Sequence, residues 1–129
     1  MKIYTGYYTK LKKYKEDGLY PIAISGKIPD FYTEAFWTDF APRYEDFLEW
    51  KSGRDSDIQY TEKYRRWLNS LDKQEIKDVL KELENEDRDI IFLCYEKSGD
   101  FCHRHILADW FEENMGLRVE EYNGEINGK

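Results

Sequence analysis

The chain has 129 residues, of which 40% are hydrophobic and 17% aromatic, and its formal net charge is −7 at pH 7. This composition supplies enough large apolar side chains for a core, so general disorder is excluded. The negative charge argues against broad, sequence-independent binding of nucleic acids, which requires many Lys and Arg side chains to neutralise phosphates.

Neither a membrane span nor a signal peptide is visible. Met1 leads directly into polar sequence, and no apolar run comes close to the ~18–20 residues that a span requires. We therefore expect a cytoplasmic protein that does not associate with membranes. The two cysteines, Cys94 and Cys102, are too few to indicate a disulfide framework, and in a cytoplasmic protein we expect both to remain thiols.

Four short apolar segments predict β-strands. They are Lys2–Thr5, Tyr20–Ser25, Asp89–Tyr95 and Leu117–Tyr122. The third contains five consecutive apolar residues, from Ile90 to Cys94. Such a continuous run is typical of a central strand that is buried on both faces of a parallel sheet.

Helical patterns fill most of the intervals between these strands. Pro42 suits the first turn of one helix, and a second helix is expected over about Ser56–Asn69. Asp72, followed three residues later by a Glu, has the spacing of a capping box at the start of a third helix. A fourth helix is expected to begin near Asp100–His103 and to stop at Gly116.

Strands that alternate with helices predict the fold class. We expect a small three-layer, Rossmann-like α/β domain with a mostly parallel sheet of about four strands. A single domain is expected over residues 1–122, and residues 123–129 are expected to form a disordered tail.

Two stretches outside the strands could contact a ligand. The aromatic stretch Lys27–Ala41 predicts a loop with short helical turns over one end of the sheet, which either covers core or forms the wall of a pocket. A dense run of lysines near the N-terminus is either a solvated helix face or a rim that attracts an anionic ligand. These lysines are Lys10, Lys12, Lys13 and Lys15.

The segment from Phe92 to Asp109 offers the most chemistry. It begins in a buried strand and continues into a helix that starts near Cys102. Ligands of open α/β sheets bind beyond the carboxyl ends of the strands, and the start of a helix favours anions. We therefore predict an anion- or nucleotide-binding site around Cys94–Arg104.

Particular residues of this segment suit particular roles. Glu96 is a candidate general base or nucleophile, and His103 is a candidate proton donor. The guanidinium of Arg104 is a candidate for binding an anion, and Cys102 lies where it could contact the same ligand. Structural roles remain open: Glu96 or Asp109 could form an ion pair with Arg104.

Neither a metal nor another cofactor is expected. Cys94, Cys102, His103 and His105 would number four zinc ligands. The two histidines are only two residues apart on a helix, however, and therefore point to different sides.

The sequence LCYEKSGDFCHRHILADWF at Leu93–Phe111 resembles the signature of short members of the bacterial and archaeal family catalogued as domain of unknown function 488 (DUF488). Weaker similarities follow in the family's order at Tyr4–Leu11, Tyr20–Tyr32, Phe40–Phe47 and Trp67–Asp72. The resemblance implies a compact α/β domain with the signature at its site. It implies no agreed reaction.

The resemblance also suggests a pocket wall. The polar turn Gly6–Thr9, before the Lys-rich helix, and the Pro-containing loop Ile28–Tyr32 correspond to stretches of the family. Phe31 and Tyr32 are our candidates for contact with a ligand in that wall, where their rings would stack on a base.

Three functions stay open. The first is an enzyme that cleaves or transfers at an N-glycosidic bond of a nucleotide or nucleic-acid base, using Glu96, His103 and Arg104. The second is a non-catalytic binder of a nucleotide-like or other anionic small molecule. The third is an interaction module in which residues 102–104 are structural. The sequence does not distinguish between these three functions, and it does not determine the oligomeric state.

Overall fold

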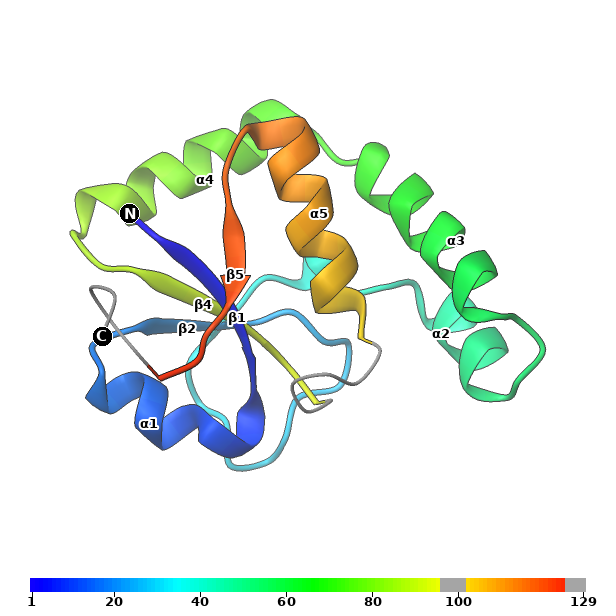
Figure 1. Cartoon of the computed structure of the whole chain (residues 1–129), viewed down its shortest axis with the longest axis horizontal. Helices are drawn as coiled ribbons and strands as arrows, with labels where there is room; N and C mark the ends of the chain where they lie inside the picture. Colours follow the sequence, from blue (N-terminus) through cyan, green and yellow to red (C-terminus); the bar gives the residue numbers. More distant parts are fainter. Residues whose placement is uncertain (96–101, 125–129) are drawn as a thin grey trace.

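The computed structural model describes residues 1–95 and 102–124. Within these residues, five parallel strands form one sheet in the order β3-β2-β4-β1-β5 (Figure 1). The strands are β1 (Ile3–Tyr7), β2 (Tyr20–Ala23), β3 (Ala35–Phe36), β4 (Ile90–Cys94) and β5 (Val119–Glu121). The predicted α/β class with a parallel, Rossmann-like sheet is confirmed.

Helices cover both faces of the sheet. They are α1 (Leu11–Glu16), α2 (Tyr44–Lys51), α3 (Asp57–Asn69), α4 (Lys73–Asn85) and α5 (His103–Met115), with 3-10 turns η1 (Tyr8–Lys10) and η2 (Thr38–Phe40). Helix α1 lies on one side of the sheet, while α4 and α5 lie on the other (Figure 1). In the part of the chain that the structure describes, no helix is both long and apolar enough to cross a membrane.

The central strand β4 is buried on both faces, as its apolar run predicts. Ile90 and Phe92 pack into the core beneath α3, α4 and α5. The alternate residues Ile91 and Leu93 pack into a second, Tyr-rich core on the α1 side. Because successive side chains of a strand point to opposite faces, this one short strand contributes side chains to both cores.

Caps set the helix boundaries close to the predicted ones. The Ser56 hydroxyl accepts from the Gln59 backbone N–H, and the Gln59 side chain accepts from the Ser56 N–H, so α3 starts with a complete capping box. The Asp72 carboxylate accepts two backbone N–H bonds at the start of α4. Gly116 ends α5 in the left-handed conformation, with φ 66°.

The fifth strand was not predicted from the sequence. Strand β3 lies inside the stretch that the sequence predicts as a loop, and its two residues pair with Ile22 and Ala23 of β2. Two residues show no periodicity, so only the hydrogen bonds to a neighbouring strand define them. The predicted tail falls mainly on residues 125–129, which lie outside the described residues.

After two neighbouring strands, β1 and β4, the chain continues on opposite faces of the sheet. From β1 the chain turns into α1 on one face, and the next helix after β4 is α5 on the other face. Strands β1 and β4 are neighbours, with Tyr7 opposite Cys94 at their carboxyl ends. Ligands of open α/β sheets bind where adjacent connections diverge in this way, so the ends of β1 and β4 mark the expected site.

Gly6 provides a test of the packing between β1 and α1. A Cβ atom at Gly6 would lie 2.5 Å from the Tyr14 Oη atom and 2.8 Å from the Ile91 Cδ1 atom. Gly6→Ala should therefore lower the free energy of unfolding by about 1–3 kcal/mol, measured by urea denaturation. Gly26→Ala is the control, because nothing lies within 4 Å of a Cβ there. Equal losses in the two variants would contradict the close approach of Tyr14 to β1.

Candidate functional site

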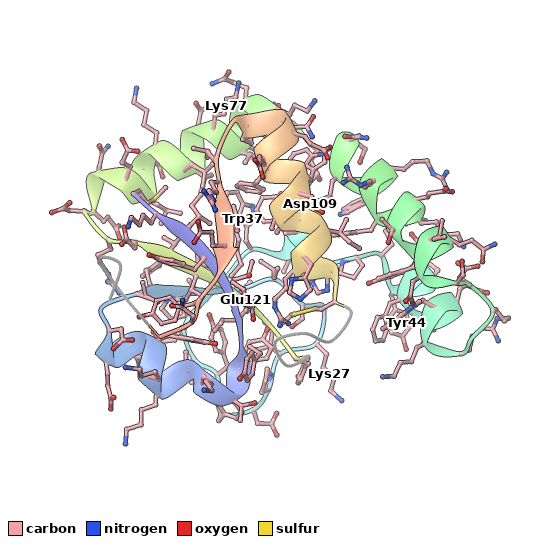
Figure 2. All side chains as sticks on the ribbon, viewed as in Figure 1. Lys27, Trp37, Tyr44, Lys77, Asp109 and Glu121 are labelled. Carbon is pink, nitrogen blue, oxygen red and sulfur yellow. A yellow bond between two sulfur atoms is a disulfide. The ribbon has the colours of Figure 1, made fainter. Side chains whose placement is uncertain are left out.

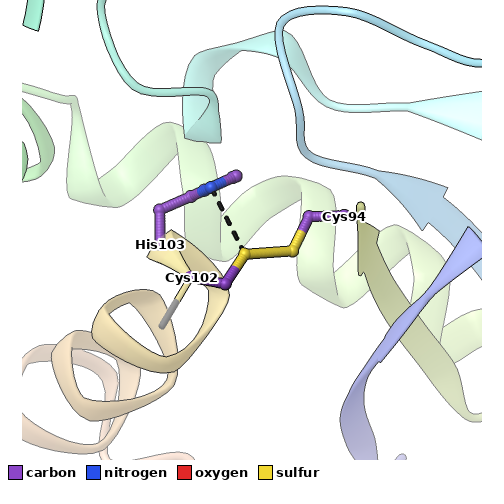
Figure 3. Close-up of side chains that lie close together, drawn as sticks. All are labelled: Cys94, Cys102 and His103. Atoms are coloured by element: carbon purple, nitrogen blue, oxygen red, sulfur yellow. Dashed lines mark hydrogen bonds between the residues drawn. A yellow bond between two sulfur atoms is a disulfide. The ribbon is translucent and has the colours of Figure 1, made fainter. Parts of the chain in front are cut away.

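The end of β4 and the start of α5 bring two sulfur atoms together. Cys94 is the last residue of β4 and Cys102 is the N-cap of α5, and their side chains form a disulfide (Figure 3). Both cysteines are buried. The expectation that they remain thiols is wrong for this structure, because the start of α5 lies beside the end of β4 and the two sulfurs are bonded.

His103 is fixed by a backbone carbonyl. Its Nε2 atom lies 2.7 Å from the Ile24 carbonyl oxygen, which can only accept, so Nε2 carries the proton. The other nitrogen, Nδ1, lies 3.7 Å from the Cys102 sulfur (Figure 3). Burial, aided by the nearby charge of Arg104, lowers the pKa of His103 to about 4. The ring is therefore neutral at pH 7, and its role as a proton donor stays a prediction.

Arg104 is fully buried and held by partners from neighbouring strands. Its Nε and Nη2 atoms each donate to a different carboxylate oxygen of Glu121 on β5, both at 3.1 Å. Its Nη1 atom donates to the Cys94 sulfur at 3.0 Å, and its guanidinium carbon lies 5.8 Å from the centre of the Tyr7 ring. The Thr5 hydroxyl also donates to Glu121, at 2.7 Å.

The ion-pair partner of Arg104 differs from those considered from the sequence. Asp109 is exposed farther along α5, whereas Glu121 lies near the start of that helix (Figure 2). Glu121 could not be predicted as the partner of Arg104 from the sequence. Glu121 is placed there by the pairing of β5 with β1, and these strands are more than a hundred residues apart in the chain. The predicted contact of Arg104 with a ligand stays a prediction, and Glu96 lies outside the described residues.

Three of the four potential zinc ligands do converge. The ligand atoms of Cys94, Cys102 and His103 all lie within 4.8 Å of one another, and all three residues are buried. His105 does not belong to this group, which agrees with the expected divergence of the two histidines.

The two aromatic candidates of the 27–41 stretch lie in different environments. Tyr32 is buried, and its hydroxyl donates to the Ala35 carbonyl. The Phe31 side chain is 62% exposed. Only Phe31 thus presents its ring to solvent.

A groove lies beside Phe31 at the carboxyl end of β1. Its volume is about 660 Å³, which is within the usual range for small-molecule sites. The lining residues are Tyr8, Thr9, Leu11, Lys12, Lys15, Glu16 and Phe31. The groove therefore draws on both stretches that the family resemblance suggested as a pocket wall, together with two lysines of the basic run.

Tyr8 connects the groove to the ends of β2 and β4. Its hydroxyl lies 2.5 Å from the Ser25 hydroxyl, and its ring packs edge-on against Tyr32 and Tyr95, with ring centres 5.4 and 5.0 Å apart. Burial raises the pKa of Tyr8 to about 12. Tyr8 is thus a neutral, rigid part of the groove at neutral pH.

Comparison with models of protein families matches residues 17–115 to DUF488-N3a, described as the active DUF488-N3 subclade. The matched range includes the Cys94–Arg104 segment and the aromatic loop. Neither the curated proteins nor the solved structures yielded a match.

The pairing of Glu121 with Arg104 can be tested by removing one charge. Glu121→Gln leaves the buried guanidinium without its counter-charge, and should lower the free energy of unfolding by about 3 kcal/mol or more. Glu120→Gln is the matched control, because Glu120 pairs with Arg118 at the surface, where both side chains are more than half exposed. That control should lose less than about 1 kcal/mol. Urea denaturation measures both, and comparable losses would contradict a structural role for the buried pair.

Proposed function

The chain belongs to the family DUF488-N3a, the active DUF488-N3 subclade, and we propose that its activity begins with the binding of a nucleotide-like small molecule in the groove beside Phe31. By nucleotide-like we mean a flat aromatic ring that carries a negatively charged group. The ligand class is the one expected from the sequence. The proposed binding surface, however, lies on the α1 side of the sheet and does not include Arg104.

The position of the groove supports the proposal. Tyr8 and Tyr95 directly follow β1 and β4, the two neighbouring strands from which the chain leaves toward opposite faces. Their rings are in contact, and Tyr8 lines the groove. The groove thus lies next to the carboxyl ends of β1 and β4, the end of a parallel sheet at which open α/β proteins bind their ligands.

The groove combines the two chemical features that a nucleotide requires. An exposed Phe31 ring offers a face on which a base can stack, and stacking tolerates any base. Lys12 and Lys15 supply positive charge on the same lining. Lys15 is paired with Glu34 at 2.7 Å, whereas Lys12 forms no ion pair with any residue that the structure describes. The proposal rests on one observation: Phe31 and Lys12 are both exposed and both line the same groove.

The overall charge favours a small ligand. A net charge of −7 repels a long polyanion such as a nucleic acid. A mononucleotide in the groove is attracted by the nearby lysines, because salt screens the more distant negative charges of the protein. The ligand class is therefore a small anionic aromatic molecule rather than a nucleic-acid backbone.

Binding can be tested with adenosine, cytidine, guanosine and uridine monophosphates by isothermal titration calorimetry. Phe31→Ala should weaken the tightest of these interactions by about 10-fold, because stacking of one base contributes ~1–3 kcal/mol. Phe36→Ala is the matched control, since Phe36 is equally exposed (62%) but lies on β3 and outside the groove lining.

A second pair of variants tests the charge. Lys12→Ala should weaken the same interaction, whereas Lys77→Ala should not, because Lys77 is exposed on α4 across the sheet (Figure 2). No saturable binding of any of the four nucleotides, or equal effects of Phe31→Ala and Phe36→Ala, would rule out this groove as the site.

Catalysis on the bound ligand is the second candidate function, and the description of the family as an active subclade favours it. Cleavage at the N-glycosidic bond would use Glu96, which follows Tyr95 in the chain. Chromatography of the same four nucleotides after incubation should then show a released base, and Glu96→Gln should lose at least about 100-fold in rate. Full turnover by Glu96→Gln would remove this mechanism, and Glu112→Gln, on the exposed side of α5, is the control.

A further inference from the structure

The cluster of Cys94, Cys102 and His103 does not line the groove, and it lies on the α5 side of the sheet edge. We propose that the reduced protein binds one zinc-class metal ion between the two cysteine sulfurs and the Nδ1 atom of His103. This site goes beyond the proposed function, and it stands or falls independently of nucleotide binding.

The imidazole of His103 is oriented as a ligand. Its Nε2–H group donates a hydrogen bond to the Ile24 carbonyl at 2.7 Å. Nδ1 is therefore unprotonated, and its lone pair faces the Cys102 sulfur. Histidines that bind metals commonly donate their other ring N–H to a backbone carbonyl, which fixes the tautomer and the ring plane. The structure already contains that outer contact.

The surroundings of the two sulfurs would stabilise the negative charge that both sulfurs carry as metal ligands. Arg104 donates from Nη1 to the Cys94 sulfur at 3.0 Å, and a guanidinium stabilises a neighbouring anion. Cys102 is the N-cap of α5, a helix of 13 residues, so it lies at the positive end of the helix dipole. Two different elements thus supply positive potential to the two sulfurs.

The backbone separation also suits a bridging ion. The Cα atoms of Cys94 and Cys102 are 7.7 Å apart. Disulfides usually join Cα atoms about 4.4–6.8 Å apart. A tetrahedral ion with Zn–S bonds of ~2.3 Å holds two sulfurs about 3.8 Å from each other, and so accommodates a wider backbone separation.

The conversion to the metal-bound form balances as two steps. First, a trialkylphosphine and one water reduce the disulfide: the S–S bond breaks, two thiols form, and the phosphine leaves as its oxide. Second, the ion binds and both thiols release their protons. A divalent ion with two thiolates and a neutral imidazole has no net charge, so the adjacent pair of Arg104 and Glu121 stays balanced. Three protein ligands leave one coordination position for water or a small ligand.

Cobalt(II) is the probe that tests this site, because its spectrum reports both thiolate ligation and tetrahedral geometry. The full chain, reduced by a phosphine under anaerobic conditions, should bind one equivalent. It should then show a thiolate-to-cobalt charge-transfer band that zinc abolishes by displacement. The same chain with its disulfide intact is the control, and it should show no such band. Absence of the band from the reduced chain would overturn the proposal.

Variants assign the ligands. The double variant with Cys94→Ser and Cys102→Ser should lose the charge-transfer band, and His103→Gln should weaken zinc binding by about 100-fold, as loss of a ligand exceeds the usual cost of losing an outer contact. His105→Gln is the control and should retain the affinity of the wild type. Circular dichroism checks that each variant is folded. Wild-type affinity in a folded His103→Gln variant, or an equal loss in His105→Gln, would overturn the assignment.

Discussion

A buried guanidinium joins three strands at the edge of the sheet where the candidate sites lie. Arg104 starts on α5 and reaches Glu121 on β5, Cys94 on β4 and the ring of Tyr7 on β1. Burying a charged side chain away from water costs folding free energy unless the charge is paired and hydrogen-bonded. Burial of Arg104 therefore requires its contacts with all three strands. The first turn of α5 therefore depends on the last strand of the chain for its place.

The sheet edge divides into two chemically different surfaces. On the α1 side, Tyr8, Lys12 and Phe31 line an open groove with aromatic and basic character. On the α5 side, sulfur and imidazole atoms lie close together and away from solvent. The division follows from topology, because β1 and β4 are neighbours whose following helices lie on opposite faces. Tyr95 comes directly after Cys94 and contacts Tyr8, so the two surfaces meet at consecutive residues.

Local patterns predicted the elements that local forces define. The apolar run of β4, the Asp72 cap of α4 and the glycine stop of α5 are all read within a few neighbouring residues. Strand β3 could not be read in this way, because only its bonds to β2 define it.

The same limit applies to the candidate site. The sequence predicts a site at the end of β4 and the start of α5, and the structure brings Cys94, Cys102 and His103 together there. The sequence does not identify Glu121 as the partner of Arg104, nor does it separate buried Tyr32 from exposed Phe31. Each of these facts depends on strand order or on tertiary packing, which leave no signal in neighbouring residues.

The strand order also constrains how the chain acquires its structure during synthesis. Both neighbours of β1 come late: β4 begins at Ile90 and β5 at Val119. A nascent chain that has just completed α4 therefore exposes β1 with two unpaired edges, and cannot assemble the centre of its sheet. Pairing of such distant segments is slow, and unpaired strands are prone to association. Synthesis must therefore reach β4 before β1 gains a neighbour in the sheet, and β1 stays open to association with other chains until then.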